Sequence, residues 1–137
     1  MNSPNDRSLQ RAAQVADERF GLVAMWLHGS HAKGHAGPRS DVDLAVLLRD
    51  QPTAIEKLSL QADMAAVIGA DVDLAVLDRD SSPILFRQLM KNGRLIVDGD
   101  ATQRAYYALW MMSAYHDLKI SRRRAEERLV ARLRDVG

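Results

Sequence analysis

The sequence of 137 residues contains no cysteine. A chain without thiols can form neither a disulfide framework nor a thiolate metal site. It also lacks a long apolar run, because the start from Met1 to Asp6 is polar and no later stretch is long enough to cross a bilayer. These absences predict that the protein has no signal peptide and no membrane partner, and they agree with a cytoplasmic location.

Low-complexity segments and a general internal repeat are also missing from the sequence. The composition, with 47% hydrophobic and 27% charged residues, is that of a folded chain rather than a disordered one. The length suits one domain over residues 1–137, with one hydrophobic core. One heptapeptide, DVDLAVL, does occur twice, at 41–47 and 71–77, but the residues after the two copies differ.

The chain as a whole has no large excess of one charge, since its net charge is +1. Its last residues, however, are strongly basic. Residues 119–137 carry seven Lys or Arg and three acids, so this segment is +4 and the rest of the chain is −3. Such a segment attracts nucleic acid or an acidic protein surface, or is simply a solvated helix face. The run Arg122–Arg124 has no interleaved aromatics, so direct nucleic-acid binding is not expected.

Strand and helix patterns alternate along the chain, which predicts an α/β layer fold. The first helix is predicted to be capped by Ser3, with Pro4 in its first turn and Gly21 at its exit. Further helices are predicted from Pro52 to Gly69, from Ser82 to Asn92, and from about Ala101 to the end. Four apolar runs predict strands, at 22–28, 41–47, 71–77 and 94–97.

Helical spacing also predicts which faces of two helices are apolar. In the helix after Pro52, the predicted core stripe is Ile55, Leu58, Ala62 and Ala65. The terminal helix is apolar over a broad arc, so it packs on its own domain or on a partner. Its two stripes are Tyr106, Trp110 and Ser113, and Ala105, Leu109 and Met112.

Two carboxylates stand at the mouth of the second strand. Because side chains alternate in a strand, Asp41 and Asp43 project from one face and Val42 points to the other. Carboxylates this close repel each other unless a cation or a proton lies between them, and oxygen ligands favour Mg²⁺ or Mn²⁺. The alternative is that Asp41 is a turn residue and Asp43 a charge at the rim of the sheet.

A Gly-Ser loop precedes these carboxylates. Gly29 lets the backbone approach a phosphate closely, and the N–H groups of the turn with the Ser30 hydroxyl form an anion-binding concavity. Lys33 adds a phosphate contact. The loop and the two aspartates together supply both halves of a Mg–nucleotide site. The nearby histidines do not indicate zinc, since the chain has no cysteine and no HExxH pattern.

The spacing Gly29-Ser30, ten residues, Asp41-x-Asp43 resembles the signature of the minimal nucleotidyltransferases of the DNA polymerase beta superfamily. The family's third carboxylate lies on a following strand, and Asp73 fits that place. The resemblance covers about residues 20–100. It implies a nucleotidyltransferase fold, with a small mixed sheet of about four strands flanked by helices and residues 101–136 as a C-terminal helical extension. Matching positions in the loop and strand are Gly29, Ser30, Ala32, Gly34, Ser40, Asp41, Asp43 and Leu44.

The resemblance also implies roles for these residues. Asp41, Asp43 and Asp73 are the implied catalytic residues and metal ligands, and Asp73 deprotonates the acceptor hydroxyl. ATP is the implied substrate, with Mg²⁺ or Mn²⁺ as cofactor. Asp71 lacks a preceding Gly-Ser loop and is interpreted as a solvated residue at a strand entrance. The implied nucleotide-binding residues are Gly29, Ser30, Lys33 and Ser40.

The length of the chain limits which kind of acceptor is expected. Larger relatives that modify antibiotics carry a further helical domain, whereas here the fourth strand is followed only by the helical extension of about 36 residues at 101–136. Chains of this size resemble the antitoxin of a HEPN/MNT toxin–antitoxin pair, which implies transfer of AMP from ATP to a tyrosine of a HEPN ribonuclease toxin. Two alternatives stay open. One is an antitoxin that acts by occlusion through the helix 106–134, and the other is a nucleotidyltransferase for an aminoglycoside-like small molecule.

Overall fold

The computed structural model describes residues 5–32 and 41–136. Helices and strands alternate over these residues, which confirms the predicted α/β architecture and its four strands. Their order is α1 (Asp6–Phe20), β1 (Leu22–His28), α2 (Gly29–Ala32), β2 (Val42–Leu48), α3 (Ala54–Ile68), β3 (Val72–Leu77), α4 (Pro83–Asn92), β4 (Arg94–Asp98) and α5 (Ala101–Val136).

The four strands form one mixed sheet in the order β3-β2-β1-β4. Strand β1 is antiparallel to both β2 and β4, whereas β2 and β3 are parallel and joined through α3. The two DVDLAVL copies therefore lie side by side. They pair in exact register, from Val42 opposite Val72 to Leu47 opposite Leu77.

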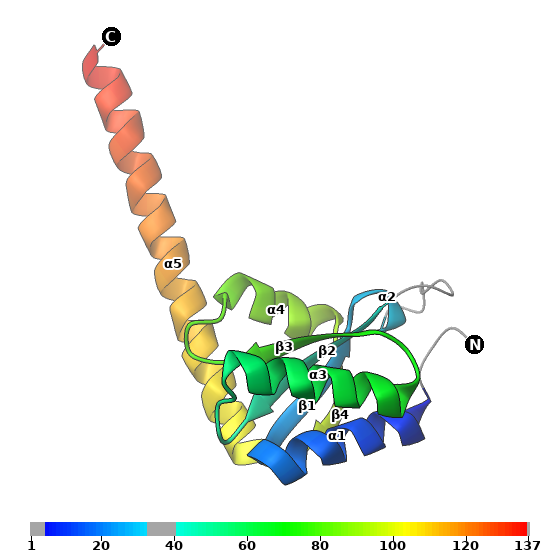
Figure 1. The fold of residues 1–137 in the computed structure, drawn as a ribbon. Helices are drawn as coiled ribbons and strands as arrows, with labels where there is room; N and C mark the ends of the chain where they lie inside the picture. Colours follow the sequence, from blue (N-terminus) through cyan, green and yellow to red (C-terminus); the bar gives the residue numbers. More distant parts are fainter. Residues whose placement is uncertain (1–4, 33–40, 137) are drawn as a thin grey trace.

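Helices cover both faces of the sheet (Figure 1). Helices α1 and α3 pack on one face, where alternate strand residues such as Met25, Leu44 and Leu74 are buried with Leu9 of α1. Helix α4 and the first part of α5 pack on the other face, around Trp26, Ala45, Leu47, Phe86 and Met111. The predicted alternation of both heptapeptides is thus confirmed, with Val42, Leu44, Val72 and Leu74 on the α1/α3 side.

Helix boundaries lie within two residues of the predictions except at the first cap; the helix predicted from Pro52 begins at Ala54, with Thr53 as its cap. Asn5, not Ser3, caps α1, because the Asn5 side chain accepts a hydrogen bond of 2.8 Å from the Ser8 N–H. Ser3 and Pro4 lie outside the described residues. Gly21 ends α1 with a φ of 71°, and α4 begins and ends as predicted.

The predicted apolar stripe of α3 is wrong. Ile55 is 80% exposed and Leu58 is also exposed, whereas Leu60 and Met64 are fully buried. Both sets recur at helical spacing, and only contact with α1 and the sheet decides which set faces inward. In the capping box that begins this helix, Thr53 and Glu56 accept hydrogen bonds from each other's backbone N–H groups.

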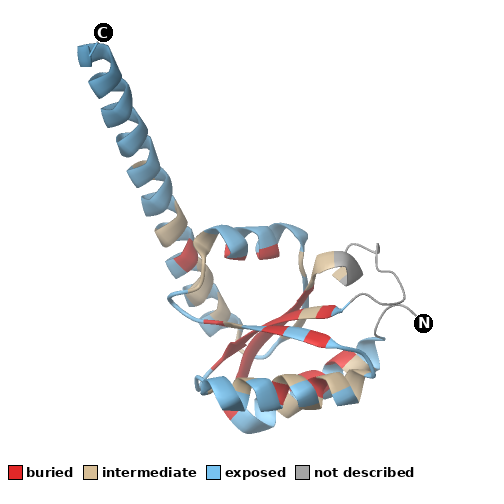
Figure 2. Cartoon of the chain, turned by 45° about the horizontal axis from the view of Figure 1, so that its top comes forward, coloured by how far each residue is buried: buried red, intermediate tan, exposed pale blue. Residues whose placement is uncertain are grey.

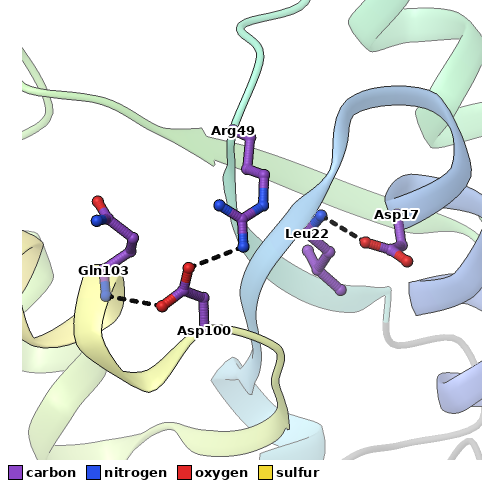
Figure 3. Close-up of polar contacts among 5 residues, drawn as sticks. All are labelled: Asp17, Leu22, Arg49, Asp100 and Gln103. Atoms are coloured by element: carbon purple, nitrogen blue, oxygen red, sulfur yellow. Dashed lines mark hydrogen bonds and ion pairs between the residues drawn. The ribbon is translucent and has the colours of Figure 1, made fainter.

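The beginning of α5 is held by polar contacts of Asp100, the residue just before the helix (Figure 3). The Asp100 carboxylate accepts hydrogen bonds from the Gln103 N–H, at 3.1 Å, and from the Arg49 guanidinium, at 2.8 Å. The Gln103 N–H, followed by Arg49, lowers the pKa of Asp100. Across β1 from this pair, Asp17 accepts a hydrogen bond from the Leu22 N–H.

The later part of α5 projects away from the domain (Figures 1 and 2). Every residue from 121 to 136 is exposed. The predicted stripes of this helix are also wrong for the packed part, because Met111 is buried with Tyr107 and Ala108 against it, while Tyr106, Leu109, Trp110 and Met112 are exposed. Within the described ranges, no helix has the length and apolar character needed to span a membrane.

The outer edge of β3 is partly covered by glutamine side chains. The Leu74 N–H donates to Gln61 Oε1 at 3.0 Å, and Gln51 Nε2 donates to the Leu77 carbonyl at 3.3 Å. These contacts come from α3 and from the segment before it. They satisfy backbone groups that an edge strand would otherwise leave unpaired.

Candidate active site

A row of three polar side chains crosses the sheet at one end of the DVDLAVL strands. His28 of β1 lies opposite Asp43 of β2, and Asp43 lies opposite Asp73 of β3. Residues opposite each other on neighbouring strands project from the same face, and the strands are about 4.8 Å apart. The row lies on the α4 side of the sheet, because Ala45 and Leu47, which follow Asp43 at two-residue steps, are buried on that side. The two heptapeptides therefore bring one carboxylate each to a shared position.

Asp41 and Asp71 lie beside each other, each two residues before the aspartate of its strand that belongs to this row. The Val42 N–H donates to the Asp71 carbonyl at 2.8 Å, so the chain segments that enter β2 and β3 are already paired there. Both residues are exposed. Four carboxylates thus lie at one end of the parallel pair, with Asp41 and Asp43 from the first copy and Asp71 and Asp73 from the second.

The carboxylates are neighbours but do not form a closed ligand cluster. Among residues 5–32 and 41–136, no group of three or more His, Asp or Glu side chains stands in a position to hold a metal ion. The donor set itself suits a hard cation, since Mg²⁺ takes oxygen ligands and uses one or two carboxylates together with phosphate oxygens. Asp43 already has an interaction partner in the folded chain.

Gly29 is the tightest point of the site. It begins α2 with a φ of +71°, which L side chains rarely adopt. A Cβ at this position would overlap Asp43 Oδ2 and lie 3.1 Å from Asp43 Cγ. Only glycine therefore fits between the end of β1 and the Asp43 carboxylate, and the backbone at Gly29 lies directly against Asp43.

Three predicted nucleotide-binding groups cannot be placed. The Ser30 side chain, Lys33 and Ser40 lie outside the described part of the chain. The backbone of Ser30 belongs to α2, the single helical turn that follows β1.

A cavity of about 540 Å³ adjoins the row, between the sheet and α4. His28 and Gly29 line one end of it, and its floor includes Ala45, Ala75 and Leu77 of the two heptapeptides. Its polar lining contains side chains to which the sequence assigned no site role: Lys57, Ser81, Ser82, Gln88 and Asn92. Lys57 comes from α3, and the others come from α4 and the two residues before it, so only the folded chain brings Lys57 to them.

His28 is the other residue that sequence reasoning undervalued. Its Nε2 is buried and has no hydrogen-bond partner in the structure. A buried polar atom of this kind costs about 1–3 kcal/mol and asks for an explanation. Strand alternation could have pointed to His28, because it places this side chain on the same face of β1 as Trp26. That face is the one from which Asp43 projects on the neighbouring strand.

Comparison with known proteins identifies the class. The family model of the polymerase beta nucleotidyltransferases matches residues 10–102, which span β1, the Gly-Ser turn and both heptapeptides. The chain therefore belongs to this family of nucleotidyltransferases, and the predicted fold and enzyme class are confirmed.

Individual relatives are more specific. The chain is 31% identical over 101 residues to the protein adenylyltransferase MntA of Shewanella oneidensis, which covers 74% of this chain and 71% of that protein. Over 59 residues it is 34% identical to the protein adenylyltransferase MntA of Thermococcus cleftensis, covering 43% of this chain and 60% of the relative.

Solved structures show the same fold. A chain from the crystal structure of a toxin–antitoxin with AMP-PNP superposes with a TM-score of 0.74 at 26% identity, covering 92% of this chain and 98% of that one. A chain from the complex of a tri-AMPylated Shewanella oneidensis HEPN toxin with its MNT antitoxin gives a TM-score of 0.67 at 24% identity, with coverage of 91% and 95%.

Proposed function

We propose that this protein is an antitoxin that transfers AMP from ATP to a tyrosine hydroxyl of a HEPN ribonuclease toxin and thereby neutralises it. The observation that carries the proposal is the pairing of Asp43 with Asp73, with Gly29 packed against Asp43. Family membership supports nucleotidyl transfer. The likeness to proteins named MntA and to a toxin–antitoxin crystallised with AMP-PNP supports AMP as the group and a toxin as the acceptor.

The carboxylates divide into two roles in this proposal. Asp41 and Asp43 are the ligands of Mg²⁺ or Mn²⁺, because they come from one strand entrance next to the Gly-Ser turn. When bound, the cation neutralises charge on the triphosphate. Gly29 and the Ser30 backbone lie where phosphate oxygens can approach N–H groups, and we assign Ser30, Lys33 and Ser40 to the same phosphates.

Asp73 is the general base. It takes the proton from the tyrosine hydroxyl, and the phenolate oxygen forms a bond to the α-phosphorus. The bond from that phosphorus to the bridging oxygen of the β-phosphate breaks, and pyrophosphate leaves. Because β3 is the edge strand, Asp73 is the carboxylate of the row that a large acceptor reaches most directly. We place this reaction in the cytoplasm, where ATP is supplied.

The test is AMP transfer in a purified system. The protein is incubated with its cognate HEPN toxin, Mg²⁺ and ATP labelled in the α-phosphate. We expect label on a toxin tyrosine, loss of RNA cleavage, and neither effect with Asp43→Asn. Absence of label on the toxin, with wild-type protein that binds the ATP analogue AMP-PNP, would contradict the proposal.

Neutralisation by occlusion is the second candidate, and the exposed apolar side chains of α5 favour it. The variant with both Asp41→Asn and Asp43→Asn separates the two. Loss of neutralisation with unchanged toxin binding supports transfer, whereas retained neutralisation supports occlusion.

A further inference from the structure

The projecting half of α5 continues the apolar stripe by which the same helix packs on its domain. At about 100° per residue, Tyr107, Met111 and Leu118 fall within an arc of about 40°. Three more residues, Ala125, Leu129 and Val136, fall within that same arc. One apolar line therefore runs along the helix from the sheet to its last turn.

Only the beginning of this stripe is covered. Met111 is 1% exposed, and the Tyr107 hydroxyl donates to the Asp78 carbonyl. Further along, Leu118 and Leu129 are exposed, and Val136 is 86% exposed. No described residue of another element packs on positions 121–136, which are all exposed. Helices in proteins gain most of their stability from packing an apolar face, so this segment of about 24 Å lacks its main source of stability.

The charges beside the stripe indicate which kind of partner surface complements it. Arg122 and Arg132 lie about 40° to either side of the stripe, and Arg128 lies about 80° from it. The only acid at a comparable angle is Glu126, about 80° away. A second copy of this helix would bring arginines against arginines, and like charges across an interface are costly. An apolar strip bordered by Asp or Glu complements both the stripe and its flanks.

We propose that the distal stripe, defined by Leu118, Ala125, Leu129 and Val136, is the surface that holds the toxin, against an acidic-bordered apolar surface of that partner. This inference rests on the proposed function for the identity of the partner. It adds that binding depends on one face of α5 that lies outside the catalytic domain, so that loss of binding and loss of transfer are separable.

Two neighbouring residues give a matched test. Leu129 lies in the stripe, Val130 lies about 100° away, and the two are similarly exposed, at 56% and 46%. We expect Leu129→Asp to weaken binding of the purified toxin at least tenfold in calorimetry, and Val130→Asp to change it less than threefold. Circular dichroism verifies that both variants keep the helix. Equal effects of the two substitutions would overturn the inference.

A second pair tests the charges alone. The double variant Arg122→Glu with Arg132→Glu reverses the flanks, whereas Arg123→Glu with Arg134→Glu reverses the same number of charges on the far side of the helix. We expect at least tenfold weaker binding for the first pair and a smaller change for the second. The difference should shrink at high salt, because exposed charges are screened.

The outcomes separate this inference from the proposed function. If the wild-type protein binds and labels the toxin but Leu129→Asp binds equally well, the inference fails and the function stands. If Leu129→Asp weakens binding but the wild type transfers no AMP, the function fails and the surface stands. Sedimentation of the wild type alone as a dimer that Leu129→Asp dissolves would make a second copy the occupant and overturn the inference.

Discussion

The two DVDLAVL strands have the same sequence, the same direction and exact register, yet they have become different parts of the protein. The first copy forms β2, which has a strand on either side, and Ala45 and Val46 are buried there. In the second copy, on the edge strand β3, the equivalent Ala75 is exposed and Val76 only half-buried. The identical local sequence therefore forms a strand in both places, whereas the position of each strand in the sheet determines how far its side chains are buried.

The same difference divides the carboxylates. Asp43 lies between His28 and Asp73 and against Gly29, whereas Asp73 has a strand neighbour on one side only. Under the proposed function, the inner carboxylate holds the nucleotide's cation. The outer one meets an acceptor that arrives from outside the sheet.

The largest expected effect is on the inner carboxylate. Asp43→Asn preserves shape and removes the charge that would balance the cation, so we expect AMP transfer to fall about 1,000-fold. The rate of toxin labelling measures this, with toxin binding as the control. A loss of less than tenfold would mean that the first copy is not the metal-binding one.

The two aspartates of the second copy are predicted to differ in role, with Asp73 as the general base and Asp71 as a solvated residue. We expect Asp73→Asn to slow transfer about 100-fold, the usual contribution of a general base. Asp71→Asn, which removes the same charge two residues earlier, should change the rate less than threefold. The same assay compares them, and a larger effect at Asp71 would reverse the assignment.

Two glycines with left-handed backbone give the third contrast, one at the end of β1 and one at the end of α3. Gly29 and Gly69 both have positive φ, but a Cβ at Gly69 meets nothing within 4 Å. Gly29→Ala should displace the Asp43 carboxylate and lower transfer by at least tenfold. Gly69→Ala should cost only the backbone strain, about 1 kcal/mol of unfolding free energy in urea, with transfer unchanged.

The smallest effect concerns stability alone. Val46→Ala removes two buried methyl groups and should lower the unfolding free energy by about 2 kcal/mol. Val76→Ala, at the same place in the second copy, should cost under about 1 kcal/mol, because this side chain is only half-buried. Equal costs would show that β3 is covered in solution.

Much of this architecture was predictable from local pattern. Strand β1, the boundaries of α4 and the beginning of α5 follow from apolar runs and from Ser82, Pro83 and Gly93, whose effects act within a few residues. The family signature likewise marks Gly29, Asp41 and Asp43 by spacing alone. Such features need no knowledge of the rest of the fold.

The features that escaped prediction depend on packing between distant segments. Ile55 and Leu60 are both apolar and both recur at helical spacing, so only the position of α1 shows that Leu60 is the buried one. The exact register of the two heptapeptides was not predictable either, since it is set by the crossover through α3. The first cap was also missed: α1 begins at Asp6, so its cap is Asn5 and not the predicted Ser3.

The glutamines on the outer edge of β3 have a consequence for how this protein meets other chains. With Gln61 on the Leu74 N–H and Gln51 on the Leu77 carbonyl, the edge is a poor template for an added strand, so the sheet resists growth into a fibre. A polypeptide that comes to Asp73 cannot dock by backbone pairing at these groups. Under the proposed function, the acceptor tyrosine then enters as a single side chain, which leaves the sequence around it free to vary.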